Sequence, residues 1–411
     1  MTRDGAPSTG LNTARVAVGV CVALFALGQF HRAAGAVFSP ILIERFALSA
    51  SAVGLLVSTL FFASVVAQVP SGVWLDRVGP RHALLVSSVC VALGTLGFAL
   101  ADSPAGLMAS RATIGLGMAA IGAASQVLLA RSVPARQFGY ANGLVVSLGG
   151  VGGLLGTLPL AVALGTFAWS TVFAVVACVT VLVALAIHRT VAEPPSAPSS
   201  PSSTPTGLGL GSLLKQPDVG RILALAVVSY APITTVTGLW GGPYLQSVHR
   251  FDPAQAGAVL MLCFAATIAA GYSFGVLDRS VRRRRRLIVV SATVSIGSLV
   301  CLAAIPALSA ELAIALLLIM VFSQQFYVPL SAHLRRVVAP DVLGRAVALF
   351  TFVAVLAIPV MQTGFALVLD SAAAAGWQPS GQYRLAFAAM AVVIAGCKAV
   401  YAGSCNADEA D

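Results

Sequence analysis

Long runs of apolar residues recur along the chain, and short polar stretches separate them. A helix needs about 20 largely apolar residues to cross the hydrocarbon core of a membrane. Twelve runs reach that length, so the pattern predicts an all-α integral membrane protein with twelve transmembrane helices. In chain order, the predicted helices span residues 16–40, 51–71, 83–101, 105–129, 139–163, 168–187, 221–247, 254–277, 287–307, 311–331, 345–370 and 384–402.

A polar stretch divides these helices into two sets of six. Residues 190–220 are rich in proline and serine. Such a composition cannot bury enough apolar surface to order itself. The sequence therefore predicts an N-terminal six-helix bundle over residues 1–189, a cytoplasmic linker over 190–220, and a C-terminal six-helix bundle over 221–411.

The distribution of Lys and Arg predicts how the helices are oriented, because cytoplasmic loops of membrane proteins carry an excess of both residues. With the N-terminus placed inside, 18 of the 24 Lys and Arg residues fall on the cytoplasmic side and three fall in outer loops. The remaining three, Arg32, Arg111 and Lys398, lie within predicted helices. We therefore expect a multi-pass protein of the cytoplasmic (inner) membrane with both termini in the cytoplasm.

The composition supports a surface that faces the lipid bilayer. Only 9% of the residues are charged and 58% are hydrophobic, whereas soluble domains carry about 25% charged residues. The net charge of +10 comes from basic residues between the apolar runs. It therefore indicates topology anchors and no nucleic-acid partner. The run Arg282–Arg286 is open to two interpretations, a topology anchor or a site for anionic lipid headgroups.

Cysteine usage and loop motifs give no sign of a cofactor. Six of the seven cysteines fall within apolar runs, at spacings that match neither a metal site nor a disulfide framework. The sequence contains no Gly-x-x-x-x-Gly-Lys phosphate loop, so we expect no ATP-driven step in this chain. The first apolar run, from Val16, lacks the cleavage site of a secretory signal peptide.

The loop after the second predicted helix carries the most specific motif. Residues 72–81 read Gly-Val-Trp-Leu-Asp-Arg-Val-Gly-Pro-Arg. This loop resembles the Gly-x-x-x-Asp-Arg-x-Gly-Arg-Arg signature of the major facilitator superfamily, with Pro80 in place of one arginine. The residues that match are Gly72, Asp76, Arg77, Gly79 and Arg81.

The resemblance implies the fold of that superfamily, two six-helix bundles related by a pseudo-two-fold axis along the membrane normal. It also implies a gating role for the loop. Asp76 would lie against the positive N-terminal end of the eleventh helix and hold the cytoplasmic side closed, and the glycines would permit the tight turn. A partial echo after the eighth helix, with Gly275, Asp278 and Arg279, supports an internal duplication.

The fourth and fifth predicted helices resemble further motifs of the superfamily in part. Leu107, Arg111, Gly115, Gly117 and Ala119 follow its fourth-helix pattern, whose arginine serves proton transfer in many proton-coupled members. Ile114 stands where that pattern usually has Gln. The fifth helix has Gly143, Gly152 and Gly156 at the spacing of drug/proton antiporters, but Thr157 replaces the expected proline.

Arg32 and Arg111 are the main candidates for chemistry within the membrane. A charged residue at the centre of a membrane helix costs about 2.5–3.5 kcal/mol on insertion scales, so it is a functional candidate by default. No Asp or Glu falls in the middle of a predicted helix. Either an anionic substrate supplies the counter-charge, or both arginines bond backbone carbonyls and side chains such as Gln29 for structure alone. The adjacent His31 either takes up a coupling proton near neutral pH or stays neutral at a helix contact.

Polar and aromatic residues of the seventh and tenth predicted helices are candidates for the same cavity. Tyr230 belongs to one face of the seventh helix by helical spacing, and Pro232 and the run Gly241–Pro243 would let that helix bend. Ordinary hydrogen bonds between helices would explain the same residues. The candidates on these two helices are Tyr230, Trp240, Gln324, Gln325 and Tyr327.

The features together predict a secondary active transporter, acting as a monomer in the bilayer, that moves a small organic anion by alternating access. The first alternative is a proton-coupled efflux antiporter for a drug or metabolite. A second is a transporter-like membrane sensor that signals to a partner. An enzyme is not expected, since the sequence offers no nucleophile–base pair and no metal cluster.

Overall fold

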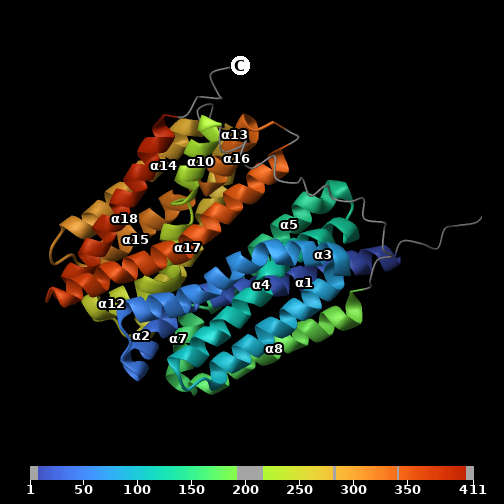
Figure 1. Ribbon diagram of the computed structural model, residues 1–411, viewed down its shortest axis with the longest axis horizontal. Coiled ribbons are helices and arrows are strands. Elements are labelled where there is room, and N and C mark those ends of the chain that lie inside the picture. Colours follow the sequence, from blue (N-terminus) through green and yellow to red (C-terminus); the bar gives the residue numbers. More distant parts are fainter. Residues whose placement is uncertain (1–7, 192–215, 281–283, 340–341, 404–411) are drawn as a thin grey trace, which may run out of the picture. The chain divides into compact units, whose positions relative to one another are not determined.

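The computed structural model describes residues 8–191, 216–280, 284–339 and 342–403, and every regular element within them is a helix (Figure 1). Eleven of these helices are long and apolar enough to cross a membrane. One of the eleven, α3 (Ala50–Leu100), has 51 residues. At 1.5 Å per residue it would be about 75 Å long, more than twice the roughly 30 Å of a hydrocarbon core. It therefore covers two of the predicted transmembrane helices.

The backbone of α3 changes direction at Gly79, within the loop at residues 72–81. Gly79 has a φ of 78° and a ψ of 165°, a conformation that lies outside the helical region and that L side chains rarely adopt. The two helices predicted at 51–71 and 83–101 thus meet at this residue. With α3 counted as two, the described residues contain twelve helices long and apolar enough to cross a membrane, as the apolar pattern predicts.

Six of the other helices are continuous and lie close to their predicted bounds. The last residues of these helices differ from the prediction by a few positions, the usual uncertainty of helix ends. They are α4 (Pro104–Ser132), α8 (Trp169–Thr190), α13 (Pro253–Ser280), α14 (Arg284–Ala304), α17 (Leu343–Ala374) and α18 (Pro379–Ala402).

The remaining four predicted helices are interrupted. Proline stands just after several of the breaks, since it lacks a backbone donor and disfavours helical geometry at the preceding residue. Pro159, Pro232 and Pro329 each lie in the first turn of a new helix. The first predicted helix comprises α1 (Ser8–Ala33) and α2 (Gly35–Phe46), and the fifth comprises α5 (Ala135–Gly149), α6 (Val151–Leu155) and α7 (Leu158–Thr166). The seventh comprises α10 (Pro217–Ala226), α11 (Ala231–Thr235), the π-helix η1 (Val236–Trp240) and α12 (Gly241–His249). The tenth comprises α15 (Ala310–Ser323), the 3₁₀-helix η2 (Gln324–Phe326) and α16 (Tyr327–Val337).

The chain packs as two compact units. The first contains α1, α3 from Thr59 onward, and α4 to α8; its core includes Cys21, Leu84, Leu128 and Ile187. In the second unit α14 packs against α15 and α18, and α17 packs against α11 and α18. The second unit also contains the segment Gly35–Ser58, which comprises α2 and the start of α3. The predicted linker at 190–220 lies mostly outside the described residues.

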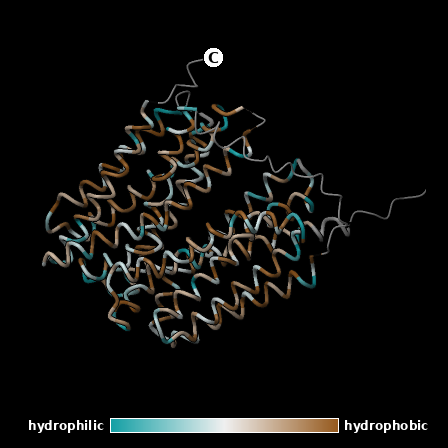
Figure 2. Tube along the Cα trace, viewed as in Figure 1, coloured by the Kyte–Doolittle hydropathy of each residue, from teal (hydrophilic) through white to brown (hydrophobic). Residues whose placement is uncertain are grey.

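Apolar side chains cover the outside of both units as well as their cores. Figure 2 shows hydrophobic residues along the lengths of the helices and hydrophilic residues mostly toward their ends. Val66 is 74% exposed and Val392 is 71% exposed. Exposed apolar side chains in such number are unfavourable in water and suit contact with lipid.

Candidate functional site

Helix interruptions occur in the first helix of each half of the chain. The break at Ala34 separates α1 from α2, and the seventh predicted helix is divided into α10, α11, η1 and α12. In transporters built from repeats, interrupted helices at corresponding positions of the two halves point to the binding site. A π-helical turn such as η1 is likewise frequent at functional sites. The candidates Arg32 and Trp240 each lie within two residues of a break.

Arg32 lies in the last turn of α1, and its side chain is half-buried. Its guanidinium donates to Oε1 of Gln29 at 2.9 Å, one helical turn earlier. The partner is a neutral amide, so this contact satisfies a donor without balancing the positive charge. The structure therefore brings these two candidates together on α1.

Arg111 is enclosed and joins α4 to α1. Its side chain is 1% exposed, and its Nη1 donates to the backbone carbonyl of His31 at 3.2 Å. The guanidinium carbon lies 6.0 Å from the centre of the Phe98 ring. His31 is also buried, with its Nε2 3.2 Å from Oγ1 of Thr95 on α3. Arg111 thus fixes the backbone next to Arg32.

The glycines of the fourth- and fifth-helix motifs lie where helices of the first unit approach closely. A Cβ at Gly117 of α4 would stand 2.7 Å from the carbonyl oxygen of Ser87 on α3. A Cβ at Gly156 would stand 2.9 Å from the carbonyl oxygen of Phe30 on α1. Gly143 meets nothing within 4 Å. The contact of α4 with α3 and that of the fifth predicted helix with α1 therefore depend on small residues.

In the second unit the structure brings two of the predicted candidates together. The rings of Tyr230 and Tyr327 have centroids 6.2 Å apart, and Tyr327 lies 5.2 Å from Phe350 of α17 by the same measure. Both tyrosines are half-buried. Gln325, which lies two residues before Tyr327 in the chain, is buried within η2.

Two other candidates use their polar atoms in contacts inside the second unit. Gln324 accepts from Oγ of Ser295 at 2.6 Å and donates to the carbonyl of Val228. Trp240 donates from Nε1 to the carbonyl of Gln362 at 3.1 Å. These contacts tie η1 and η2 to neighbouring helices.

Gln362 is a buried polar residue that the sequence analysis did not single out. Its Nε2 donates to the carbonyl of Thr234 at 3.0 Å, and its Oε1 accepts from Oγ of Ser58 at 2.9 Å. The residue lies at 0% exposure in α17. The sequence feature that could have identified Gln362 is the presence of a polar amide within the apolar predicted helix 345–370. Its buried hydrogen bonds link α17, α11 and the start of α3.

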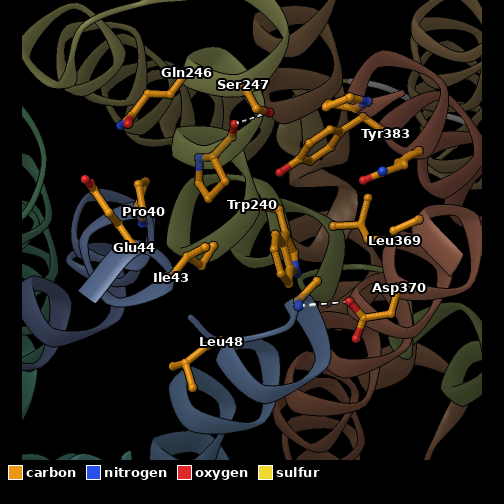
Figure 3. Close-up of a pocket in the computed structure, with 15 residues that line it drawn as sticks. Pro40, Ile43, Glu44, Leu48, Trp240, Gln246, Ser247, Leu369, Asp370 and Tyr383 are labelled. Carbon is orange, nitrogen blue, oxygen red and sulfur yellow. Dashed lines mark hydrogen bonds between the residues drawn. The ribbon is translucent and has the colours of Figure 1, made fainter. Parts of the chain in front are cut away.

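A pocket of about 440 Å³ opens among elements of the second unit (Figure 3). Trp240 is the one predicted site residue that lines it. Its walls combine apolar side chains with two carboxylates, those of Glu44 and Asp370. The lining residues are Pro40, Ile43, Glu44, Leu48, Ala50, Trp240, Pro243, Gln246, Ser247, Leu369, Asp370, Ala373, Pro379, Gln382 and Tyr383.

The predicted gating loop lies around the Gly79 turn of α3. Arg81 donates from Nη2 to the carbonyl of His188 on α8 at 2.9 Å. Asp76 and Arg77 are exposed, and Gly72 has open space where a Cβ would stand. The contact of Asp76 with the eleventh helix stays a prediction. In the echo loop, Asp278 forms an ion pair with Arg284.

A family model described as Major Facilitator Superfamily matches residues 18–362. The chain belongs to the major facilitator superfamily. This match confirms the resemblance shown by the loop at 72–81, and with it the twelve-helix fold. The protein is thus a multi-pass membrane protein of a transporter family.

Each curated relative matches less than two fifths of this chain, and the match covers less than two fifths of the relative's own length. A probable anion transporter 6 of the Arabidopsis thaliana chloroplast is 35% identical over 138 residues, 32% of this chain and 25% of that protein. The human facilitated glucose transporter member 12 of solute carrier family 2 is 31% identical over 147 residues, 34% of this chain and 23% of that protein. The uncharacterized transporter YybO of Bacillus subtilis is 28% identical over 156 residues, 38% of this chain and 36% of its own.

Solved structures match over nearly the whole chain. A bacterial homolog of the human lysosomal transporter Spinster gives a TM-score of 0.76 at 17% identity, covering 93% of this chain and 95% of that one. The nucleoside transporter NupG gives 0.78 at 13% identity, with 96% and 100% covered. A D-xylose–proton symporter gives 0.76 at 14% identity, with 97% and 98% covered. At these identities the likeness shows a shared fold.

Proposed function

We propose that this member of the superfamily is a secondary active transporter that moves a small organic anion across the cytoplasmic membrane by alternating access. Arg32 carries the proposal for the substrate. It is half-buried beside a helix break, and its side-chain partner is the neutral amide of Gln29. No carboxylate occupies the middle of a predicted helix. A carboxylate or phosphate group on the substrate would engage the guanidinium through two charge-assisted hydrogen bonds.

Arg111 has a different proposed role, that of a positioning residue. Its guanidinium is enclosed at 1% exposure and bonds the carbonyl of His31. The residue that follows this carbonyl group is Arg32. Arg111 would therefore hold the backbone that presents Arg32, while His31, buried and within hydrogen-bond distance of Thr95, is proposed to stay neutral at the contact of α1 with α3.

Residues of the second unit are also proposed to bind substrate, through less charged groups. Tyr230, Gln325 and Tyr327 combine ring faces and polar tips near two helix interruptions. Trp240 and Gln324 would act by fixing those interruptions, since their polar atoms already bond Gln362, Ser295 and Val228. The likeness to a probable anion transporter supports this substrate class.

Substitution of Arg32 tests the substrate class directly. Arg32→Lys keeps the charge but loses the planar fork, so binding should weaken; Arg32→Ala should weaken it further. Hydrogen bonds to charged groups are worth about 1.5–3 kcal/mol, so Arg32→Ala should lose at least about tenfold in affinity. Arg15→Ala is the matched control, because Arg15 is an exposed arginine of the same helix.

The measurement combines ligand-dependent thermal stabilisation of the purified protein with flux into proteoliposomes. The compounds tested are matched carboxylates, phosphate esters, amines and neutral sugars. Stabilisation by amines alone, or wild-type flux in Arg32→Ala, would refute the anion hypothesis and favour the efflux alternative. Ligand binding without flux in proteoliposomes that contain only this protein would favour the sensor alternative.

A further inference from the structure

The first turn of α3 is capped from two different parts of the chain. The first backbone N–H groups of a helix lack partners inside the helix. Ala52 donates its N–H to Oγ of Ser49, one turn away, at 3.2 Å. Ala50 and Ser51 instead donate to the two carboxylate oxygens of Asp370, at 2.9 and 2.8 Å. Asp370 lies near the end of α17, about 320 residues further along the chain.

Figure 3 shows the Asp370 carboxylate beside the start of α3, at the wall of the pocket. Asp370, Ala50 and Ser51 are all half-buried. Water therefore has access near this helix end and would satisfy the two N–H groups in the absence of the carboxylate. Since Asp370 is not required to satisfy the helix, what it adds is a bond between α17 and α3. A carboxylate at a helix N-terminus is stabilising because of the helix dipole.

The rest of the segment Gly35–Ser58 is held on the same helices by close packing. At its other end, Ser58 donates to Gln362 of α17 at 2.9 Å. A Cβ at Gly35 would overlap the carbonyl of Gly238 in η1, and a Cβ at Gly242 of α12 would overlap the carbonyl of Ala36. The segment therefore fits against α12, η1 and α17 through backbone contact and two polar links.

We propose that Asp370 is a latch that keeps the segment Gly35–Ser58 closed on the C-terminal helices. The segment continues directly into α3, whose residues from Thr59 onward belong to the first unit. If the protein works by alternating access, as proposed above, opening at this end must separate the segment from α12 and α17. Hydrogen bonds at a half-buried helix end suit that role, because water replaces them when the contact opens.

Labelling of a buried thiol reports the opening. Ser39 lies in the segment at 0% exposure and bonds its own helix at Gly35, so Ser39→Cys is a conservative reporter. In full-length protein with this reporter, Asp370→Asn should raise the rate of labelling by a soluble maleimide. The expected rise is about two- to fivefold, the range expected for a carboxylate at a helix N-terminus.

Two further variants make the test specific. Ser371→Ala is the matched control, because Ser371 is the exposed neighbour of Asp370 and its hydroxyl bonds Val368 of the same helix, so the labelling rate should stay unchanged. Ala50→Pro removes one of the two latch donors at the first helical position, where proline is tolerated, and leaves Asp370 intact. It should raise the rate by less than Asp370→Asn does.

Two outcomes would overturn the latch: unchanged labelling in both Asp370→Asn and Ala50→Pro, or an equal rise in Ser371→Ala, which would indicate a general loosening of the end of α17. If Asp370→Asn does not fold, Ala50→Pro alone decides. Thermal stabilisation by carboxylates in the same preparations separates the two proposals. If carboxylates do not stabilise the protein but Asp370→Asn raises the labelling rate as expected, only the proposed substrate class is wrong. If carboxylates stabilise the protein and the labelling rate is unchanged, only the latch is wrong.

Discussion

At the scale of single residues, the sequence identified the charged candidates and the structure assigned their partners. Arg32 and Arg111 stand out because ionised side chains are rare within apolar runs. Their difference in burial was not predictable, because it depends on how α1, α3 and α4 pack. Gln362 was missed for the same reason: a single amide in an apolar run becomes notable only when Trp240, Thr234 and Ser58 are seen around it.

The two arginines should respond differently to substitution. Arg111→Ala removes a buried donor from the carbonyl of His31, and hydrogen bonds to charged groups contribute about 1.5–3 kcal/mol. We therefore expect a clearly lower midpoint of thermal unfolding for Arg111→Ala and near wild-type stability for Arg32→Ala. Scanning fluorimetry in detergent measures both, with Arg131→Ala as the control, since Arg131 is an exposed residue of α4. Equal loss of stability in both variants would make Arg32 a structural residue too.

At the scale of elements, the apolar pattern predicted the positions of the helices well but not their continuity. The bounds of α4 and α8 follow from where apolar runs begin and end. The breaks in the seventh predicted helix, anticipated from Pro232 and the run Gly241–Pro243, are confirmed. The breaks at Ala34 and at η2 were not anticipated. No proline stands in the first turn after Ala34, and the sequence analysis did not single out Pro329, in the first turn after η2.

The fifth predicted helix offers a test of element packing with an internal control. A Cβ at Gly152 of α6 would overlap the backbone of Ala26 on α1, so Gly152→Ala should destabilise the protein by about 1–3 kcal/mol through overpacking. Gly143 of α5 has no atom within 4 Å of such a Cβ. Gly143→Ala should therefore be neutral or stabilising by up to about 1 kcal/mol, the helix preference of Ala over Gly. Thermal unfolding of the two variants gives the comparison, and equal effects would contradict the proposed α1–α6 packing.

At the scale of the whole molecule, the family and the twelve-helix fold were accessible from the sequence because each rests on a repeated or highly specific pattern. The apolar runs recur with the length of a membrane crossing, and five residues of the loop at 72–81 match the family signature in the expected place. The grouping of Gly35–Ser58 with the C-terminal helices was not accessible in this way. It depends on the glycine contacts and on Asp370, which only three-dimensional packing brings together.

The orientation of the molecule in the membrane is the last prediction, and it follows from the distribution of Lys and Arg. Both termini should be cytoplasmic, which places the start of α18 outside and the end of α8 inside. Ser380 and Thr190 are exposed at these two helix ends. In intact cells, a membrane-impermeant maleimide should therefore label Ser380→Cys and leave Thr190→Cys unlabelled until the membrane is permeabilised. The parent protein measures background labelling of its native cysteines. Labelling of Thr190→Cys from outside, with Ser380→Cys protected, would invert the topology, and labelling of both from one face would contradict the odd number of crossings, five, predicted between them.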